Sequence, residues 1–298
     1  MLHPQARAAL EAAAGDQRVS DPAFDVEAER ARDRAAALAG PREQVAQVRD
    51  LEAAGVPVRF YRPAVDRVPA LVVHLHGGGF VLNDVEVHDA SARRLTNRTG
   101  MAVLSVEYRR PPEHPFPAAP DDVSAVTDWL VAGGLEELGL DPSTPLLAHG
   151  DSAGANLALV AALRHPGRFA ALALIYPFLD PTMAGESYRT EVQGFDPADA
   201  RWYWDQYAAT PADLEHPDLA PLRSDRLGTL PPTLVVTAEH DPLRDEGELL
   251  AGRLAELGVE VVGTRYLGML HGFWRHPDAY HAAEPLMRQV AAFLGQHV

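Results

Sequence analysis

Short runs of apolar and β-branched residues recur along this chain, and several are followed by segments with helical periodicity. Runs of about four to eight such residues, bounded by glycine or proline, are typical of buried strands. We predict strands at residues 70–75, 145–149, 170–175, 233–238 and 259–266, and helices at 155–163 and 243–257. Strands that alternate with helices form parallel sheets covered by helices on both faces. The pattern therefore predicts an α/β fold with a mostly parallel central sheet.

The segment Gly150-Asp151-Ser152-Ala153-Gly154 lies between a predicted strand and a predicted helix. A tight turn there forces strained backbone angles on the serine, and only glycine-sized neighbours let strand and helix pass each other. Ser152 is therefore a candidate nucleophile. The Gly-x-Ser-x-Gly pattern alone is weak, because it arises by chance in many chains. A serine nucleophile also needs a base, an acid that orients the base, and donors for an oxyanion.

Three glycines follow the predicted strand at 70–75, in His76-Gly77-Gly78-Gly79-Phe80. Because glycine has no side chain, the backbone N–H groups of this loop can approach a ligand closely. A phosphate-binding loop would end in Gly-Lys-Ser/Thr, and the chain contains no lysine. The loop is a candidate source of oxyanion donors.

An acid is expected after the serine, just past the end of a strand. Asp241 follows the predicted strand at 233–238 and suits this role better than Glu239. It also precedes Pro242, which suits the first turn of a helix, so Asp241 could simply be the N-cap of that helix. Both interpretations stay open for Asp241 taken alone.

His271 lies in the predicted loop 267–273, after the last predicted strand, where a base is expected. Most histidines take no part in catalysis, so it is the position of His271 in the chain that makes it a candidate base. Ser152, Asp241, His271 and the glycine loop all follow strand ends, and in a parallel sheet these ends share one edge. Four such coincidences favour a catalytic site at this edge.

Composition narrows the remaining classes of function. The chain has 298 residues, no cysteine and a formal net charge of -16. We expect a single domain over 1–298 with no disulfides, no thiolate nucleophile and no nucleic acid or membrane partner. No stretch approaches the roughly 18 apolar residues of a membrane span, and no signal-peptide core is evident, so we expect a cytoplasmic protein. The oligomeric state, including a homodimer, is left open.

Two segments fall outside the strand and helix alternation, at about 1–45 and about 181–225. Both could cover the catalytic edge. In the second segment Asp196 and Pro197 predict a helix start, followed by a cluster of aromatic residues. These aromatic residues either line a substrate pocket or attach the segment to the body. The candidate pocket residues are Phe80, Trp202, Tyr203, Trp204 and Tyr207.

A metal site at His74 and His76 is a further alternative, since residues two apart on a strand share a face. No third ligand lies at a convincing spacing. We expect buried, hydrogen-bonded histidines and no metal or other cofactor.

Taken together, the motifs resemble those of the bacterial hormone-sensitive-lipase-like (family IV) carboxylesterases of the α/β-hydrolase superfamily. The matching stretches span most of the chain: His76 to Phe80, Tyr108 to Ala119, Gly150 to Ala158, Asp241 to Gly247, and His271 to Phe273. The resemblance implies an α/β-hydrolase fold with a helical cap built from the segments 1–45 and 181–225. It also implies these roles: Ser152 as nucleophile, Asp241 as acid, His271 as base, and Gly77, Gly78 and Ala153 as oxyanion donors.

The sequence departs from the family pattern at two places. Arg110-Pro111 replaces the usual Leu-Ala, and His240 occupies a position often held by tyrosine. Neither is a proposed catalytic residue, although His240 beside the acid could alter the titration of Asp241.

We therefore predict a serine carboxylesterase that acts on small-molecule esters of short to medium acyl chain through an acyl-enzyme. A related hydrolase of amides, lactones or carbamates would use the same residues. A small-molecule receptor of the same fold is a third reading, which the presence of His271 disfavours. The natural ester and its stereochemistry depend on the shape of the cap.

Overall fold

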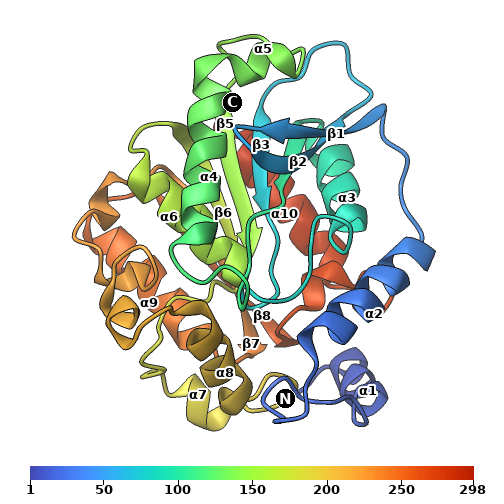
Figure 1. Cartoon of the computed structure of the whole chain (residues 1–298), viewed down its shortest axis with the longest axis vertical. Helices are drawn as coiled ribbons and strands as arrows, with labels where there is room; N and C mark the ends of the chain where they lie inside the picture. Colours follow the sequence, from blue (N-terminus) through green and yellow to red (C-terminus); the bar gives the residue numbers. More distant parts are fainter.

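Four of the five predicted strands, those at 70–75, 145–149, 170–175 and 233–238, lie inside an eight-stranded sheet and are almost wholly buried. The fifth, at 259–266, forms one edge of that sheet (Figure 1). The computed structural model describes residues 1–298. Its strands are β1 (Gln47–Ala53), β2 (Val56–Arg62), β3 (Leu71–Leu75), β4 (Ala102–Val106), β5 (Leu146–Asp151), β6 (Phe169–Ile175), β7 (Thr233–His240) and β8 (Val261–Leu270). They are ordered β1-β2-β4-β3-β5-β6-β7-β8, with β2 antiparallel to both neighbours and every pair from β4 to β8 parallel. The expected α/β fold with a mostly parallel sheet is confirmed.

Helices cover both faces of this sheet, which is why its central strands are almost wholly apolar. The helices are α1 (Pro4–Ala12), α2 (Val26–Ala39), α3 (Asp89–Thr99), α4 (Ala118–Trp129), α5 (Leu135–Glu137), α6 (Ala153–Arg164), α7 (Ser187–Thr190), α8 (Pro197–Tyr207), α9 (Arg244–Glu256) and α10 (Ala283–Gly295). Apolar side chains of α3 and α10 fill the core on one face, and those of α4, α6 and α9 fill the core on the other. None of these helices is both long and apolar enough to cross a lipid bilayer.

The strands β1 and β2 were not among the predicted ones. They form a hairpin at the edge of the sheet, and the turn at Ala54 and Gly55 has positive φ at both positions, 51° and 84°. Such a turn matches the twist of a two-residue hairpin. Polar residues alternate with apolar ones in both strands, so neither reads as an apolar run.

The strand β8 is longer than predicted, because it continues through the expected loop as far as Leu270. Gly268 has a φ of +74°, and its N–H donates to Glu239 Oε2 at 2.6 Å. The pairing with β7 is irregular here and resumes at His240 and Leu270. The prediction of a loop at 267–270 is therefore wrong, since a glycine bulge keeps the strand paired. His271 follows the strand directly.

The segments 1–45 and 181–225 lie at the end of the molecule toward which β7 and β8 run (Figure 1). The first contains α1 and α2, and the second contains α7 and α8. The helix α8 begins as its sequence predicts: the Asp196 side chain accepts from the Ala198 N–H, and Pro197 occupies the first turn.

Candidate active site

Ser152 occupies a tight turn between β5 and α6. Its φ is 54° and its ψ is -120°, a strained conformation for a residue other than glycine. A Cβ atom at Gly154 would lie 2.0 Å from the Leu75 carbonyl oxygen, and one at Gly150 would lie 2.3 Å from the Gly154 carbonyl. Only glycine fits at either position, so the elbow predicted from the sequence is present.

Ser152, His271 and Asp241 meet at the carboxyl ends of β5, β8 and β7. His271 Nε2 lies 3.0 Å from Ser152 Oγ, and His271 Nδ1 lies 2.8 Å from Asp241 Oδ2. A carboxylate only accepts hydrogen bonds, so His271 Nδ1–H donates to Asp241 and the neutral Nε2 accepts from the serine hydroxyl. The arrangement can remove the serine proton during an attack on a carbonyl carbon.

Asp241 is fully buried, and its two oxygens have different partners. Oδ2 faces His271, while Oδ1 accepts from the Leu243 backbone N–H at 2.9 Å. The helix α9 begins at Arg244, and its N-cap residue is Leu243. The alternative in which Asp241 serves as the N-cap of that helix is therefore wrong. The side chain instead holds the turn before α9 and orients His271.

The glycine loop runs beside Ser152, but the three glycines differ in what their N–H groups can bind. The Gly77 N–H donates to Asp151 Oδ1 at 3.0 Å, so it is already occupied. The expectation that Gly77 donates to an oxyanion is wrong for this reason. Gly78 and Gly79 line the cavity in front of Ser152 and both have positive φ, 124° and 58°. A Cβ at Gly79 would lie 2.1 Å from the Tyr203 ring.

A cavity of about 700 Å³ opens in front of Ser152 and His271. Its apolar lining comes from the segments 1–45 and 181–225 and from the loops at the sheet edge, and includes Leu10, Leu82, Phe195, Tyr203 and Leu270. Its polar lining includes Asp33, Asn83, Asp151 and Arg275. A cavity of this size, apolar with a few polar groups, is typical of a small-molecule site.

Only one of the five predicted pocket residues, Tyr203, lines this cavity. Phe80, Trp204 and Tyr207 are fully buried in the core, where the rings of Phe80 and Tyr207 stack with centroids 3.7 Å apart. Trp202 packs edge-on against Phe24. The pocket assignment of these four residues is wrong. The rings of Phe80, Trp204 and Tyr207 attach the 181–225 segment to the core, and the contact of Trp202 with Phe24 joins that segment to the N-terminal one. Phe195 and Leu10 were missed, since no motif marks them.

The histidines that suggested a metal site belong instead to a buried aromatic cluster behind the nucleophile. His74 Nδ1 lies 3.0 Å from His149 Nδ1, and the His76 ring stacks on Tyr108 with centroids 4.2 Å apart. No three acidic or histidine side chains are arranged to hold a metal ion. His240 points away from the triad, since its Nδ1 pairs with Glu191 Oε2 at 2.8 Å.

Comparison with known proteins supports a common origin over most of the chain. Residues 72–275 match a family model described as an alpha/beta hydrolase fold. Carboxylic ester hydrolase LipN of Mycobacterium tuberculosis is 38% identical over 266 residues, which cover 84% of this chain and 70% of LipN. Ethyl acetate hydrolase of Pseudomonas putida is 34% identical over 254 residues, which cover 82% of this chain and 79% of that protein.

Comparison with solved structures also identifies an esterase of similar fold. A hyperthermophilic esterase from the archaeon Pyrobaculum calidifontis superposes with a TM-score of 0.90 and 37% identity, covering 99% of this chain and 98% of that one. The fold and the family match define an α/β-hydrolase. Within that fold, the chain belongs to the hormone-sensitive-lipase-like family of carboxylic ester hydrolases, which confirms the resemblance found in the sequence.

Proposed function

We propose that this chain is a serine carboxylesterase for esters of short to medium acyl chain, with Ser152 as nucleophile, His271 as general base and Asp241 as the acid that orients it. The observation that carries this proposal is the contact chain Asp241–His271–Ser152, with distances of 2.8 and 3.0 Å, at the floor of a cavity of about 700 Å³. The relatives named as ester hydrolases support the same reaction class.

In the first half-reaction Ser152 Oγ attacks the ester carbonyl carbon while His271 Nε2 takes the hydroxyl proton. The tetrahedral intermediate collapses, the carbon–oxygen bond to the alcohol breaks, and His271 returns the proton to the leaving oxygen. Water then adds to the acyl-enzyme with the same histidine as base, which releases the acid and regenerates Ser152. No cofactor takes part in this scheme.

The oxyanion of the intermediate needs donors within about 3 Å. We assign this role to the N–H groups of Gly78, Gly79 and Ala153. Gly78 and Gly79 line the cavity beside Ser152, whereas the Gly77 N–H is held by Asp151. Ala153 is the first residue of α6, and a first-turn N–H has no partner within its own helix.

The lining of the cavity supports a limit on acyl length. We propose that α1, α2 and the 181–225 segment form a cap over Ser152, because Leu10, Phe195 and Tyr203 of these segments line the same cavity. Each methylene enclosed by such a pocket gains about 0.8 kcal/mol until the pocket ends, and further carbons gain nothing. A formal net charge of -16 disfavours anionic lipid interfaces. The cytoplasmic location remains a prediction.

Labelling and a substrate panel test the proposal. A fluorophosphonate probe followed by peptide mapping should label Ser152 alone. p-Nitrophenyl esters from acetate to palmitate, with a triolein emulsion beside them, should give the highest kcat/KM at about two to eight acyl carbons. Highest activity on palmitate with sharp activation at the triolein interface would contradict the chain-length proposal. A parallel panel of amides, lactones and carbamates separates the related hydrolase classes.

A further inference from the structure

Arg275 lies four residues after the proposed base and contributes to the wall of the catalytic cavity. It is half-buried, yet its guanidinium has no carboxylate within ion-pair distance. Its one side-chain hydrogen bond joins Nη1 to His88 Nε2 at 2.8 Å. A half-buried cation that binds a neutral ring in place of an acid is unusual, because burial of an unpaired charge costs free energy.

His88 lies between Arg275 and Asp151, the residue before the nucleophile. Because a guanidinium only donates, His88 Nε2 accepts, and the proton of the neutral imidazole resides on Nδ1. Burial, and then the Arg275 charge, hold the pKa of His88 well below its usual value. His88 Nδ1 faces Asp151 Oδ1 at 3.6 Å and has no closer partner. The ring thus lies between a positive and a negative group with its dipole aligned to both.

Asp151 in turn holds the start of the glycine loop. It is 2% exposed, and its Oδ1 accepts from the Gly77 N–H at 3.0 Å. Burial raises the pKa of Asp151, and the Arg275 charge is the largest effect that opposes this rise. The Gly77 carbonyl is held as well, by the Asn83 amide at 3.1 Å. Gly77 is therefore fixed at both ends, immediately before the proposed donors Gly78 and Gly79.

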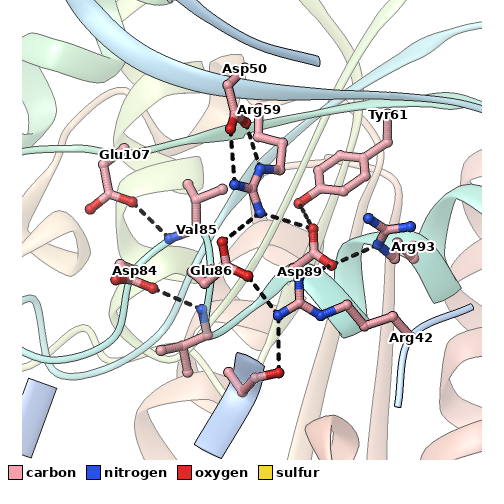
Figure 2. Close-up of polar contacts among 12 residues, drawn as sticks. Arg42, Asp50, Arg59, Tyr61, Asp84, Val85, Glu86, Asp89, Arg93 and Glu107 are labelled. Atoms are coloured by element: carbon pink, nitrogen blue, oxygen red, sulfur yellow. Dashed lines mark hydrogen bonds and ion pairs between the residues drawn. The ribbon is translucent and has the colours of Figure 1, made fainter. Parts of the chain in front are cut away.

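The residues next to His88 in the chain make a dense set of ion pairs and hydrogen bonds (Figure 2). Asp89, fully buried, accepts from Arg59 Nη1 at 3.1 Å, from the Tyr61 hydroxyl at 2.9 Å and from Arg93 Nε at 2.6 Å. Glu86 accepts from Arg59 Nη1 at 3.0 Å. These contacts tie the backbone on both sides of His88 to β2 and α3.

We propose that Arg275 is a positioning residue that acts through His88 and Asp151 on the glycine loop, and so sets the geometry of the oxyanion donors. The proposal rests on the esterase function proposed above. Its physical basis is charge: Arg275 favours the ionised form of Asp151, and a carboxylate is a stronger acceptor for the Gly77 N–H than a neutral carboxyl group. Arg275 need not touch the substrate in this role.

A double-mutant cycle tests the proposal on the full chain with p-nitrophenyl butyrate. Arg275→Gln should lower kcat about 10- to 100-fold with KM changed less than about threefold, because one oxyanion donor is worth about 10² to 10³ in kcat. Asp151→Asn should show a similar loss. Adding Arg275→Gln to Asp151→Asn should change kcat less than about twofold, since both substitutions act through one contact. Arg275→Lys should recover part of the loss.

The matched control is Arg98→Gln, a half-buried arginine that pairs with Glu43 and Glu284 away from the cavity. It should leave kcat and KM near their original values. Circular dichroism and thermal unfolding check that each variant folds; should Arg275→Gln fail to fold, Arg275→Met, which preserves the packing volume, takes its place in the cycle.

Several results would overturn the proposal. A raised KM with unchanged kcat means that Arg275 binds substrate directly. Losses that multiply in the double variant mean that Arg275 does not act through Asp151. Ser152→Ala is assayed alongside: if it stays active, the esterase mechanism fails and the positioning role fails with it, whereas an inactive Ser152→Ala beside a fully active Arg275→Gln overturns the positioning role alone.

Discussion

His271 Nε2 lies 3.0 Å from Ser152 Oγ, although 119 positions separate the two residues in the chain. The strands β5 and β8 that carry them are separated by β6 and β7 in the sheet. Ser152 projects from a strained turn after β5, and His271 follows directly on β8. The contact therefore depends on the parallel alignment of four strands, and several substitutions should report on it.

Replacing the nucleophile should abolish hydrolysis without unfolding the protein. Ser152→Ala removes the attacking oxygen, and the loss of one triad nucleophile costs on the order of 10⁴ to 10⁶ in turnover. Ester hydrolysis and fluorophosphonate labelling measure the effect, and thermal unfolding serves as the control for folding. Near-normal turnover by the purified variant would show that Ser152 is not the nucleophile.

Removing the negative charge of Asp241 should prevent His271 from acting as an efficient general base. In Asp241→Asn the amide nitrogen at position 241 can donate to His271 Nδ1. This favours the tautomer with its proton on Nε2, which cannot accept the serine proton, and should lower kcat by about 10⁴. Asp245→Asn is the matched control: the Asp245 side chain accepts from the Ser187 N–H and from Arg244, outside the triad. We expect Asp245→Asn to retain most activity. The opposite ranking of the two variants would show that the acid is misassigned.

The buried histidines should make the fold sensitive to mild acid. Burial lowers the pKa of His74 to about 4 and holds the pKa of His76, His88 and His149 well below their usual value. Below pH 6.5 the unfolded chain then binds more protons than the native state, so stability falls as pH falls. Each histidine contributes up to about 1.4 kcal/mol per pH unit in this range.

Urea unfolding at pH 7.5, 6.5 and 5.5 measures this effect. The exposed His281→Gln serves as the control, because this residue lies outside the cluster and the variant should follow the same pH profile. An unfolding free energy that stays constant from pH 7.5 to 5.5 is incompatible with a neutral, buried cluster.

Glu246 should have the opposite effect on stability: it should lower the free energy of unfolding as pH rises. Burial raises its pKa well above the usual value, so the native state binds a proton that the unfolded chain loses above about pH 4.5, and stability falls as pH rises. Glu246 accepts from the Leu179 N–H at 2.7 Å and from the Tyr188 hydroxyl at 3.1 Å. Glu246→Gln keeps an acceptor for the Leu179 N–H, and its amide nitrogen can donate to the Tyr188 oxygen.

The advantage of Glu246→Gln over the unchanged protein should therefore grow with pH between 5 and 8, by up to about 1.4 kcal/mol per pH unit until the native carboxyl ionises. Paired urea titrations across this range give the difference directly. A difference that is constant with pH would mean that Glu246 is ionised throughout.

The sequence alone determined the elements that depend on local chemistry. Gly150 and Gly154 flank Ser152 because strand and helix cross there without room for a Cβ, and such a constraint is visible in the motif. Asp241 and His271 could be placed because each follows a strand, and parallel strands end at one edge. These features are properties of neighbouring residues, so periodicity and glycine positions indicate them.

Only the tertiary structure decided which groups are free to act. The Gly77 N–H is lost as an oxyanion donor because Asp151, 74 positions away, accepts from it. Trp204 and Tyr207 lie in the core and Phe195 lines the cavity, because the path of the 181–225 segment sets which rings face inward. Contacts between distant segments are fixed by packing and burial across the whole molecule, and no local pattern encodes them.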